Sequence, residues 1–314
     1  MKNFLAGMLA AFGASLFLLL ITLPLLKRLK AGQYILGYVK EHKDKGGTPT
    51  MGGLAFIAAI IAVGLCAFGV RDGKINMTLA ITGGFTIVGF LDDFLKVYRK
   101  DNGGLKPYQK IIFQFAIATV AAVYCYLNGI TRLYIPFAGK SGFDIDWGII
   151  PLVILIFIAT VNCVNLTDGL DGLAGGTSSA YLLIFGIILY MQGNGSAMLC
   201  FIAVGALAAF LLLNVNKASV FMGDTGSLAL GGFISCISVF SGNSLYIPII
   251  GIMFVISGIS VIVQVIYYKR TRRRVFLMAP IHHHFQMKGH TECKIVYAYV
   301  LITALVGIIC LLFV

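Results

Sequence analysis

Two adjacent carboxylates stand where an apolar stretch of the sequence ends. Asp92 and Asp93 follow the apolar run 79–91, and Lys96 comes soon after them in LDDFLK (91–96). A buried charge is costly and two neighbouring like charges are costlier, so acids at membrane depth indicate a functional site. On a helix, Asp92 and Lys96 share a face, whereas Asp93 projects about 100° away. A solvated ion pair at a helix end is the alternative interpretation.

A second polar group lies in VNCVNLTDGLDGLAGG (161–176), where Asn162 and Asn165 precede Asp168 and Asp171. In a helical segment, a spacing of three would aim both acids at one side. The glycines that follow each acid allow a ligand to approach the backbone closely. A capped turn at the start of the next helix is the competing interpretation.

A third acid, Asp224, lies in FMGDTGSLALG (221–231) just ahead of a predicted helix, so helix capping competes with a functional role. Taken together, the three segments bring carboxylates from three junctions between apolar stretches to one face of a membrane. Such oxygen-rich groups suit Mg²⁺. Basic residues at the same level would hold an anionic substrate; they are Lys45, Lys96, Lys106, Lys110 and Lys217.

Three consecutive histidines stand in PIHHHF (280–285). Neighbouring side chains diverge on a helix, so we do not expect His282, His283 and His284 to form one three-histidine metal site. Anion binding or proton handling fits the basic surroundings better. Incidental histidines in a surface loop are the alternative.

The composition is that of an integral membrane protein. Of the 314 residues, 59% are hydrophobic and 11% are charged, and the mean hydropathy is +0.94. A soluble domain has about 25% charged residues, and a helical span needs about 20 apolar residues. We predict an all-α polytopic protein with a single domain, 1–314. Its ten transmembrane spans would be roughly 4–26, 51–70, 77–95, 108–127, 148–163, 173–191, 195–213, 225–241, 245–267 and 295–314.

The distribution of basic residues predicts the orientation. Nineteen of the 24 Lys and Arg residues lie in the loops that carry the motifs, which places these loops in the cytoplasm and both termini outside. The outer loop 128–147 contains alternating residues and Pro/Gly turn signals, which predict a short hairpin. The net charge of +12 is spread over loops at the membrane surface, so we expect contact with the lipid bilayer and no nucleic-acid binding.

The motifs together resemble a known family. KGGTPTMGG (45–53), LDDFLK, NLTDGLDGLA (165–174), FMGDTGSLALG and PIHHHF cover nearly the whole chain. They are similar to the motifs of the polyprenyl-phosphate N-acetylhexosamine-1-phosphate transferase superfamily, and the TPTMGG stretch with the triple histidine resembles its muramoyl-pentapeptide branch. Gln286 departs from the pattern, because many members have Glu after HHHF, so no role is assigned to this position.

The resemblance implies a reaction and a setting. UDP-MurNAc-pentapeptide and undecaprenyl phosphate would give lipid I and UMP with Mg²⁺ as cofactor. It also implies ten transmembrane helices, a homodimer, termini outside and a cytoplasmic active site in the bacterial cell membrane. The alternatives are a sister transferase that uses UDP-GlcNAc and, from another class, an ion-coupled transporter. A transporter would place its acids near the middle of spans rather than at their cytoplasmic ends.

The resemblance also implies roles for individual residues. Asp224 would be the main Mg²⁺ ligand with Asp93 assisting, and Asp92 would lie nearest the lipid phosphate as its base, a nucleophile or a positioning charge. The implied catalytic residues are Asp92, Asp93, Asp224 and His283. The implied substrate-binding residues are Lys45, Lys96, Lys110, Asn162, Asn165, Asp168, Asp171, Phe221, Gln264, His282 and His284. A single displacement and a covalent two-step route both remain open, and we favour the former because the lipid phosphate is already a competent nucleophile.

Overall fold

Long apolar helices make up most of the computed structural model, which describes residues 2–28, 47–69, 72–100, 103–138 and 141–313. Nine of the helices in these ranges are long and apolar enough to cross a membrane, and α2 is a shorter apolar helix. The all-α prediction of about ten spans is therefore confirmed. The ten are α1 (Lys2–Arg28), α2 (Gly53–Phe68), α3 (Gly73–Arg99), α4 (Pro107–Leu127), α5 (Ile149–Thr167), α6 (Leu173–Met191), α7 (Ala197–Asn214), α8 (Gly223–Phe240), α10 (Ile252–Thr271) and α12 (Glu292–Leu311).

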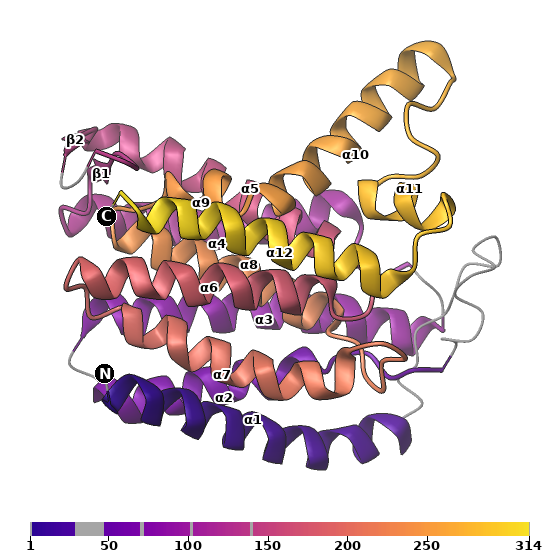
Figure 1. Cartoon of the computed structure of the whole chain (residues 1–314), viewed down its shortest axis with the longest axis horizontal. Coiled ribbons are helices and arrows are strands. Elements are labelled where there is room, and N and C mark those ends of the chain that lie inside the picture. Colours follow the sequence, from indigo (N-terminus) through magenta and orange to yellow (C-terminus); the bar gives the residue numbers. More distant parts are fainter. Residues whose placement is uncertain (1, 29–46, 70–71, 101–102, 139–140, 314) are drawn as a thin grey trace.

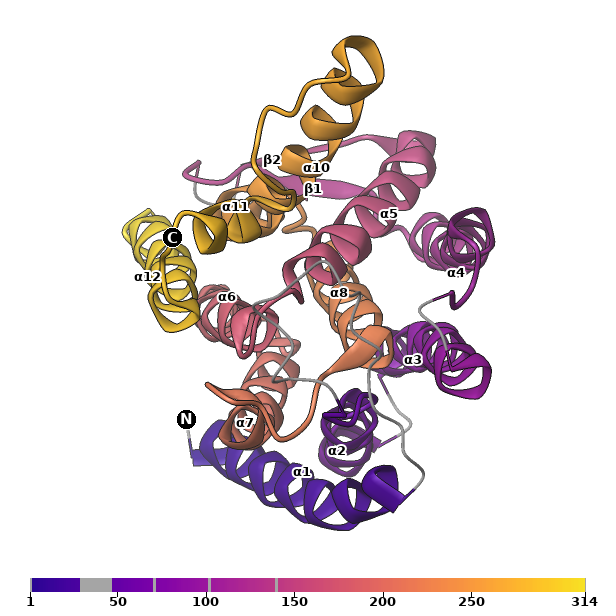
Figure 2. The same ribbon diagram turned by 90° about the vertical axis from the view of Figure 1, so that its right-hand side faces the viewer.

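Helix α8 lies at the centre of the bundle and the other helices surround it (Figure 2). Every residue of α8 from Thr225 to Phe240 is buried. Small residues allow the neighbours to approach closely, as is typical of helix packing in membranes. A Cβ at Gly89 of α3 would lie 2.6 Å from the Cα of Thr225, and one at Gly231 would lie 2.6 Å from the Cα of Val161 on α5. These contacts pack α3 and α5 directly against α8.

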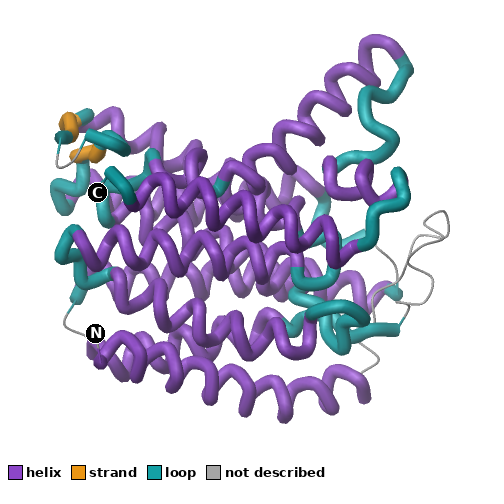
Figure 3. Tube along the Cα trace, viewed as in Figure 1, coloured by secondary structure: helices purple, strands orange, loops and turns teal. Residues whose placement is uncertain are grey.

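The two ends of the bundle differ (Figure 1). One end carries both termini and the hairpin of β1 (Arg132–Tyr134) and β2 (Gly142–Asp144), which pair antiparallel with Arg132 opposite Asp144 and are followed by the short 3-10 helix η3 (Asp146–Gly148). This confirms the predicted hairpin. The other end carries α11 (Ile281–Met287) and most of the longer loops (Figure 3). The motif-bearing junctions lie at this second end.

The observed helices differ from the predicted spans by a few residues at many of their ends, and three of the differences matter for the site or for the shape of the bundle. Helix α5 continues to Thr167 rather than ending at 163, because the Thr167 hydroxyl donates to the carbonyl of Cys163 (2.8 Å) and the helix therefore tolerates polar residues. The predicted span 245–267 is divided at Gly251 into α9 (Tyr246–Ile250) and α10, which continues to Thr271 and leans away from the bundle in Figure 1. Helix α8 begins at Gly223, so Asp224 lies in its first turn and not ahead of it.

Candidate active site

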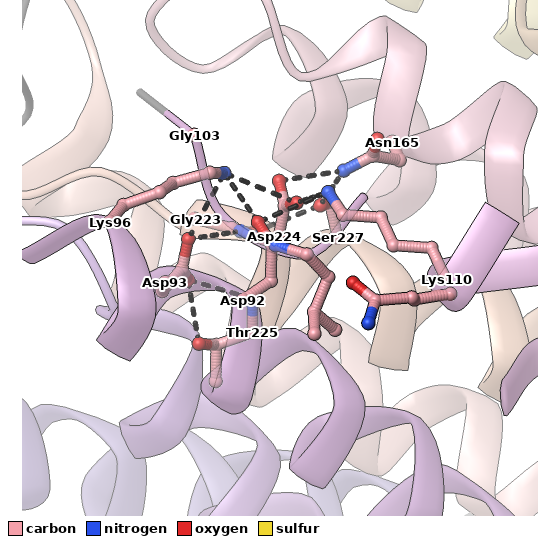
Figure 4. A network of polar contacts seen from close by, with 12 residues as sticks. Asp92, Asp93, Lys96, Gly103, Lys110, Asn165, Gly223, Asp224, Thr225 and Ser227 are labelled. Carbon is pink, nitrogen blue, oxygen red and sulfur yellow. Dashed lines mark hydrogen bonds and ion pairs between the residues drawn. The ribbon is translucent and has the colours of Figure 1, made fainter. Parts of the chain in front are cut away.

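Three carboxylates from two helices meet at the loop-rich end of the bundle. Asp92 and Asp93 lie near the end of α3, and Asp224 lies at the start of α8 (Figure 4). One oxygen from each lies within 4.8 Å of the others. The side chains of Asp92 and Asp93 are 0% and 3% exposed, whereas that of Asp224 is 16% exposed. Solvent therefore reaches Asp224 most readily.

Two lysines neutralise most of this charge. Lys96 Nζ lies 2.6 Å from Asp92 Oδ2, 3.7 Å from Asp93 Oδ1 and 3.3 Å from Asp224 Oδ2. Lys110, on α4, pairs with Asp224 Oδ2 and lies 3.1 Å from Asp92 Oδ2. The predicted shared face of Asp92 and Lys96 is confirmed, but Lys96 also reaches Asp93. Three carboxylates and two ammonium groups leave one net negative charge at the site.

Asp93 caps α8 from the neighbouring helix. Its carboxylate accepts hydrogen bonds from the main-chain N–H of Asp224 (3.2 Å) and Thr225 (2.9 Å) and from the Thr225 hydroxyl (2.7 Å). The first N–H groups of a helix have no partner within it, and an acid there also interacts favourably with the helix dipole. Asp224 is thus not a cap but a residue whose position α3 fixes.

Both candidate asparagines lie on α5, and the structure brings one of them to the carboxylates. Asn165 donates to Asp224 Oδ1 (3.0 Å) and to the Ser227 hydroxyl (2.8 Å). Asn162 lies a turn earlier, where it donates to Gln114 Oε1 of α4 (2.6 Å) and to the carbonyl of Ile158. Asn165 therefore orients Asp224, and Asn162 joins α5 to α4.

Asp168 and Asp171 lie in the turn between α5 and α6 and not on a helix. Asp171 accepts from the main-chain N–H of Ala218 (3.0 Å), so it fixes the loop before α8. Loss of hydration, followed by repulsion from Asp224 and Asp93, raises the pKa of Asp168 to about 8. Asp168 is therefore mainly protonated at neutral pH in the ligand-free protein, and a protonated carboxyl can donate a hydrogen bond as well as accept one.

The TPTMGG motif holds the segment that leads into α8. The N–H of Phe221 donates to the carbonyl of Pro49 (2.8 Å), and the N–H groups of Gly52 and Gly53 donate to the carbonyls of Phe221 and Met222 (2.9 and 3.0 Å). A Cβ at Gly52 would lie 2.9 Å from the Phe221 carbonyl oxygen. The sequence predicted no structural role for this motif, although its two adjacent glycines allow a close approach of another backbone. These bonds fix the backbone at Phe221, a half-buried residue three positions before Asp224.

The three histidines occupy the short helix α11 and face different surroundings. His282 is fully buried, and neither of its ring nitrogens has a hydrogen-bond partner among the described residues. Burial, followed by the adjacent His283, lowers the pKa of His282 well below its usual value, so its ring is neutral. His283 shares a hydrogen bond with Gln286 (3.1 Å), and His284 Nδ1 accepts from the N–H of Leu277 (3.1 Å).

Glycine 169 connects the histidine helix to the Asp168 turn. A Cβ at Gly169 would lie 3.0 Å from His283 Nε2 and 3.2 Å from His282 Cδ2, so α11 packs directly on this turn.

Gln264 of α10 holds the segment that follows its own helix, because its side-chain amide bonds to the backbone of Val275 (3.1 Å) and Phe276 (2.9 and 3.2 Å). Gln286 also donates to Glu292 (3.2 Å). Lys45 lies outside the residues that the structure describes.

Comparison with known proteins places the chain in a family. The family model described as glycosyl transferase family 4 matches residues 74–242. The chain is 40% identical over 309 residues to the phospho-N-acetylmuramoyl-pentapeptide-transferase of Staphylococcus carnosus, covering 95% of each chain. It is 42% identical over 309 residues to that of Bacillus subtilis, covering 96% of this chain and 95% of the relative. It belongs to the phospho-N-acetylmuramoyl-pentapeptide-transferase family. The relative from Clostridioides difficile is 43% identical over 296 residues, covering 91% and 90% of the two chains.

The carboxylates of this transferase fit a divalent cation. Asp92, Asp93 and Asp224 offer oxygen ligands close together, and their net negative charge persists beside the two lysines. Hard cations such as Mg²⁺ prefer carboxylate oxygens and commonly keep several waters. Asp93 already accepts three hydrogen bonds. The more exposed Asp224 is thus the member of the group best able to exchange a lysine for a metal ion.

Proposed function

We propose that this chain transfers phospho-MurNAc-pentapeptide from UDP-MurNAc-pentapeptide to undecaprenyl phosphate, which yields lipid I and UMP. The observation that carries the proposal is the group of Asp92, Asp93 and Asp224, with two lysines, at the loop end of a membrane bundle that belongs to this family. One substrate arrives from water and the other from the bilayer, and both can reach a site at this depth.

The chemistry joins two anions. An oxygen of the lipid phosphate attacks the β-phosphorus of the nucleotide sugar, and the bond from that phosphorus to the bridging oxygen breaks, so that UMP leaves with the bonding electrons. Lys96 and Lys110 lie where they can neutralise the phosphates. The second pKa of a phosphate monoester is near 6, so the attacking group needs no strong base at neutral pH.

A bound Mg²⁺ would supply additional charge neutralisation where the phosphates meet. We assign it to Asp224 first, with Asp93 beside it, as the family resemblance implies. The exposure of Asp224 supports this assignment, and the hydrogen bonds of Asp93 to the start of α8 favour a supporting role for that residue.

The surroundings of Asp92 support a single displacement. A covalent route would need a carboxylate that is free to attack phosphorus. The side chain of Asp92 is fully buried, and its Oδ2 is held by Lys96 and Lys110. These contacts suit a charge that positions the lysines, and they leave the lipid phosphate as the nucleophile.

The nucleotide and sugar would lie between the carboxylates and α11. We propose that Phe221 stacks on the uracil, that Asn165 and Asp168 contact the nucleoside and its phosphates, and that His283 contacts the sugar phosphate. The backbone hydrogen bonds that hold the segment at Phe221 and the packing of α11 on Gly169 support this arrangement. The remaining candidates are Lys45, Asn162, Asp171, Gln264, His282 and His284; the contacts of Asn162 and Gln264 favour support of the fold rather than direct binding.

The setting follows the same reasoning. We propose a single-domain protein of the bacterial cytoplasmic membrane, active as a homodimer, with its site in the cytoplasm and its termini outside. The location of both termini at the end opposite the site supports this topology.

Turnover by the purified protein tests the function directly. UMP release is measured with UDP-MurNAc-pentapeptide and undecaprenyl phosphate, with and without Mg²⁺, and UDP-GlcNAc serves as the control donor. We expect Mg²⁺-dependent turnover of the first donor only, and a loss of about 100-fold or more for Asp224→Ala, because the change removes charge stabilisation at the reacting phosphates. Near-wild-type turnover by Asp224→Ala would reject the metal assignment, and turnover of UDP-GlcNAc alone would reject the substrate.

A further inference from the structure

The segment Gly103–Leu105, which precedes α4, closes over Asp92. The main-chain N–H of Leu105 donates to Asp92 Oδ1 (2.7 Å). The other oxygen, Oδ2, faces Lys96 and Lys110. Oδ1 therefore accepts a hydrogen bond from the backbone, whereas Oδ2 is balanced by its ion pairs with the two lysines. This satisfies a charge that has no access to solvent and that would otherwise be costly to bury.

Gly104 leaves no space between this segment and the carboxylate. A Cβ at Gly104 would lie 2.7 Å from Asp92 Cγ and 2.9 Å from Oδ2, and closer still to Oδ1. The φ angle of Gly104 is outside the left-handed region, so an alanine there meets a steric obstacle but no backbone strain. Glycine is required here because of the carboxylate it contacts.

Both ends of the segment are anchored. Arg99 at the end of α3 donates to the carbonyl of Gly103 (3.2 Å). On the other side, Leu105 packs on an apolar cluster to which α3, α4, α5 and α8 contribute, and the N–H of Lys106 donates to Gln109 at the start of α4 (2.9 Å). The segment cannot easily withdraw from a larger side chain, so Asp92 would have to move instead.

We propose that Gly104 is a positioning residue for the transfer reaction. Together with the Leu105 N–H it fixes the Asp92 carboxylate, and Asp92 fixes the ammonium groups of Lys96 and Lys110. Both lysines face Asp224, where the phosphates would bind in the proposed reaction. If Asp92 is displaced, Lys96 and Lys110 keep their charges, but their ammonium groups are no longer held in the same positions. Ground-state binding of the nucleotide should then persist, while stabilisation of the transition state is lost.

Steady-state kinetics of Gly104→Ala test this inference, which rests on the proposed transferase activity. We expect kcat to fall by about 10- to 100-fold while KM for UDP-MurNAc-pentapeptide changes by less than about threefold. The matched control is Gly83→Ala on α3, where a Cβ meets nothing within 4 Å among the described residues; its kcat should stay within about twofold of wild type. A wild-type kcat for Gly104→Ala, or an equal loss in kcat for the control, overturns the proposal.

Thermal unfolding in detergent tests the same contact without relying on turnover. Asp92→Ala removes the atoms that a Cβ at position 104 would meet. Gly104→Ala should therefore lower the melting temperature of the wild-type background by about 2–4 °C or more, and that of the Asp92→Ala background by less than about 1 °C. Equal losses in both backgrounds overturn the proposal. If the single variant does not accumulate, accumulation of the double variant supports the proposal and its failure to accumulate contradicts it.

Discussion

The three carboxylates of the candidate site have different surroundings, because their oxygens contact different partners. Asp92 is held between a backbone N–H and two lysines, Asp93 caps α8, and Asp224 remains partly exposed. Chemical type and proximity alone would have assigned all three to a metal ion. The distinction predicts that their substitution will separate stability from catalysis.

Asp93→Ala should destabilise the protein more than Asp224→Ala does. The first change leaves the N–H groups of Asp224 and Thr225 without their acceptor, and losing a helix cap costs about 0.5–2 kcal/mol. The second removes one of three mutually repelling acids, while Asp92 still pairs with both lysines. Melting temperatures in detergent should show a loss of roughly 2–8 °C for Asp93→Ala and little change for Asp224→Ala. A larger loss for Asp224→Ala would contradict the capping role of Asp93.

Asp168 should make the ligand-free protein less stable as the pH rises. Its folded pKa of about 8 exceeds its usual value of 3.8, so between these limits the folded state binds a proton that the unfolded state has released. The contribution of this residue is fully present below pH 4 and is lost towards pH 8. Between pH 5 and pH 8.5, the melting temperature of the wild type should fall by roughly 2–4 °C more than that of Asp168→Asn. Parallel pH profiles for the two proteins would show that Asp168 does not carry this proton.

Local spacing predicted some of these contacts and not others. The pairing of Asp92 with Lys96 follows from helical periodicity, and the structure shows it. The capping of α8 by Asp93 joins residues 131 positions apart, so no local pattern could indicate it. Asn162 and Gln264 had the residue types of ligand contacts, but their amides are bonded to Gln114 and to the backbone near Phe276. Residue type does not reveal which partner lies nearest.

At the scale of elements, the contact between α3 and α8 builds the site. The helices approach at Gly89, one turn before Asp93 and opposite the residues that follow Gly223. Backbone atoms and not flexible side chains lie across this contact, so the helices must separate to admit a Cβ. A shift there moves Asp93 away from the start of α8.

Gly89→Ala should therefore impair both folding and activity. A Cβ at this position would lie 2.6 Å from the Cα of Thr225 and closer to the backbone of Asp224. Overpacking of this kind typically costs about 1–3 kcal/mol, and we expect a lower melting temperature together with a loss of transferase activity of about 10-fold or more. Gly83→Ala on the same helix is again the control. Wild-type activity in Gly89→Ala would mean that the site tolerates separation of these helices.

Hydropathy predicted where most elements lie but not where they bend. Apolar runs located the ten helices, of which nine in the described part of the chain are long and apolar enough to cross a bilayer and α2 is shorter. The division at Gly251 and the extension of α10 to Thr271 are features of the backbone to which a hydropathy window is insensitive. The same applies to α5, whose polar final turn is satisfied by hydrogen bonds within the bundle.

The two ends of the molecule differ, and the end that carries the candidate active site is its functional end. Both termini and the β1–β2 hairpin lie at one end, and the carboxylates and α11 lie at the other (Figure 1). The loops at the functional end carry most of the basic residues. The rule that relates basic loops to the cytoplasm then gives the molecule a direction in the membrane.

Trypsin should reveal this direction in sealed membranes. The exposed run Arg272–Arg274 follows α10 at the functional end, and the exposed Arg132 lies in the hairpin at the other. With the site in the cytoplasm, trypsin should cleave after 272–274 in inside-out vesicles and spare this run in intact spheroplasts, because the bilayer blocks access. An Arg272→Gln/Arg273→Gln/Arg274→Gln variant that loses this fragment identifies the cleavage site. Cleavage of the run from the outer surface of spheroplasts would reverse the assigned orientation, and with it the proposal that the nucleotide substrate reaches the site from the cytoplasm.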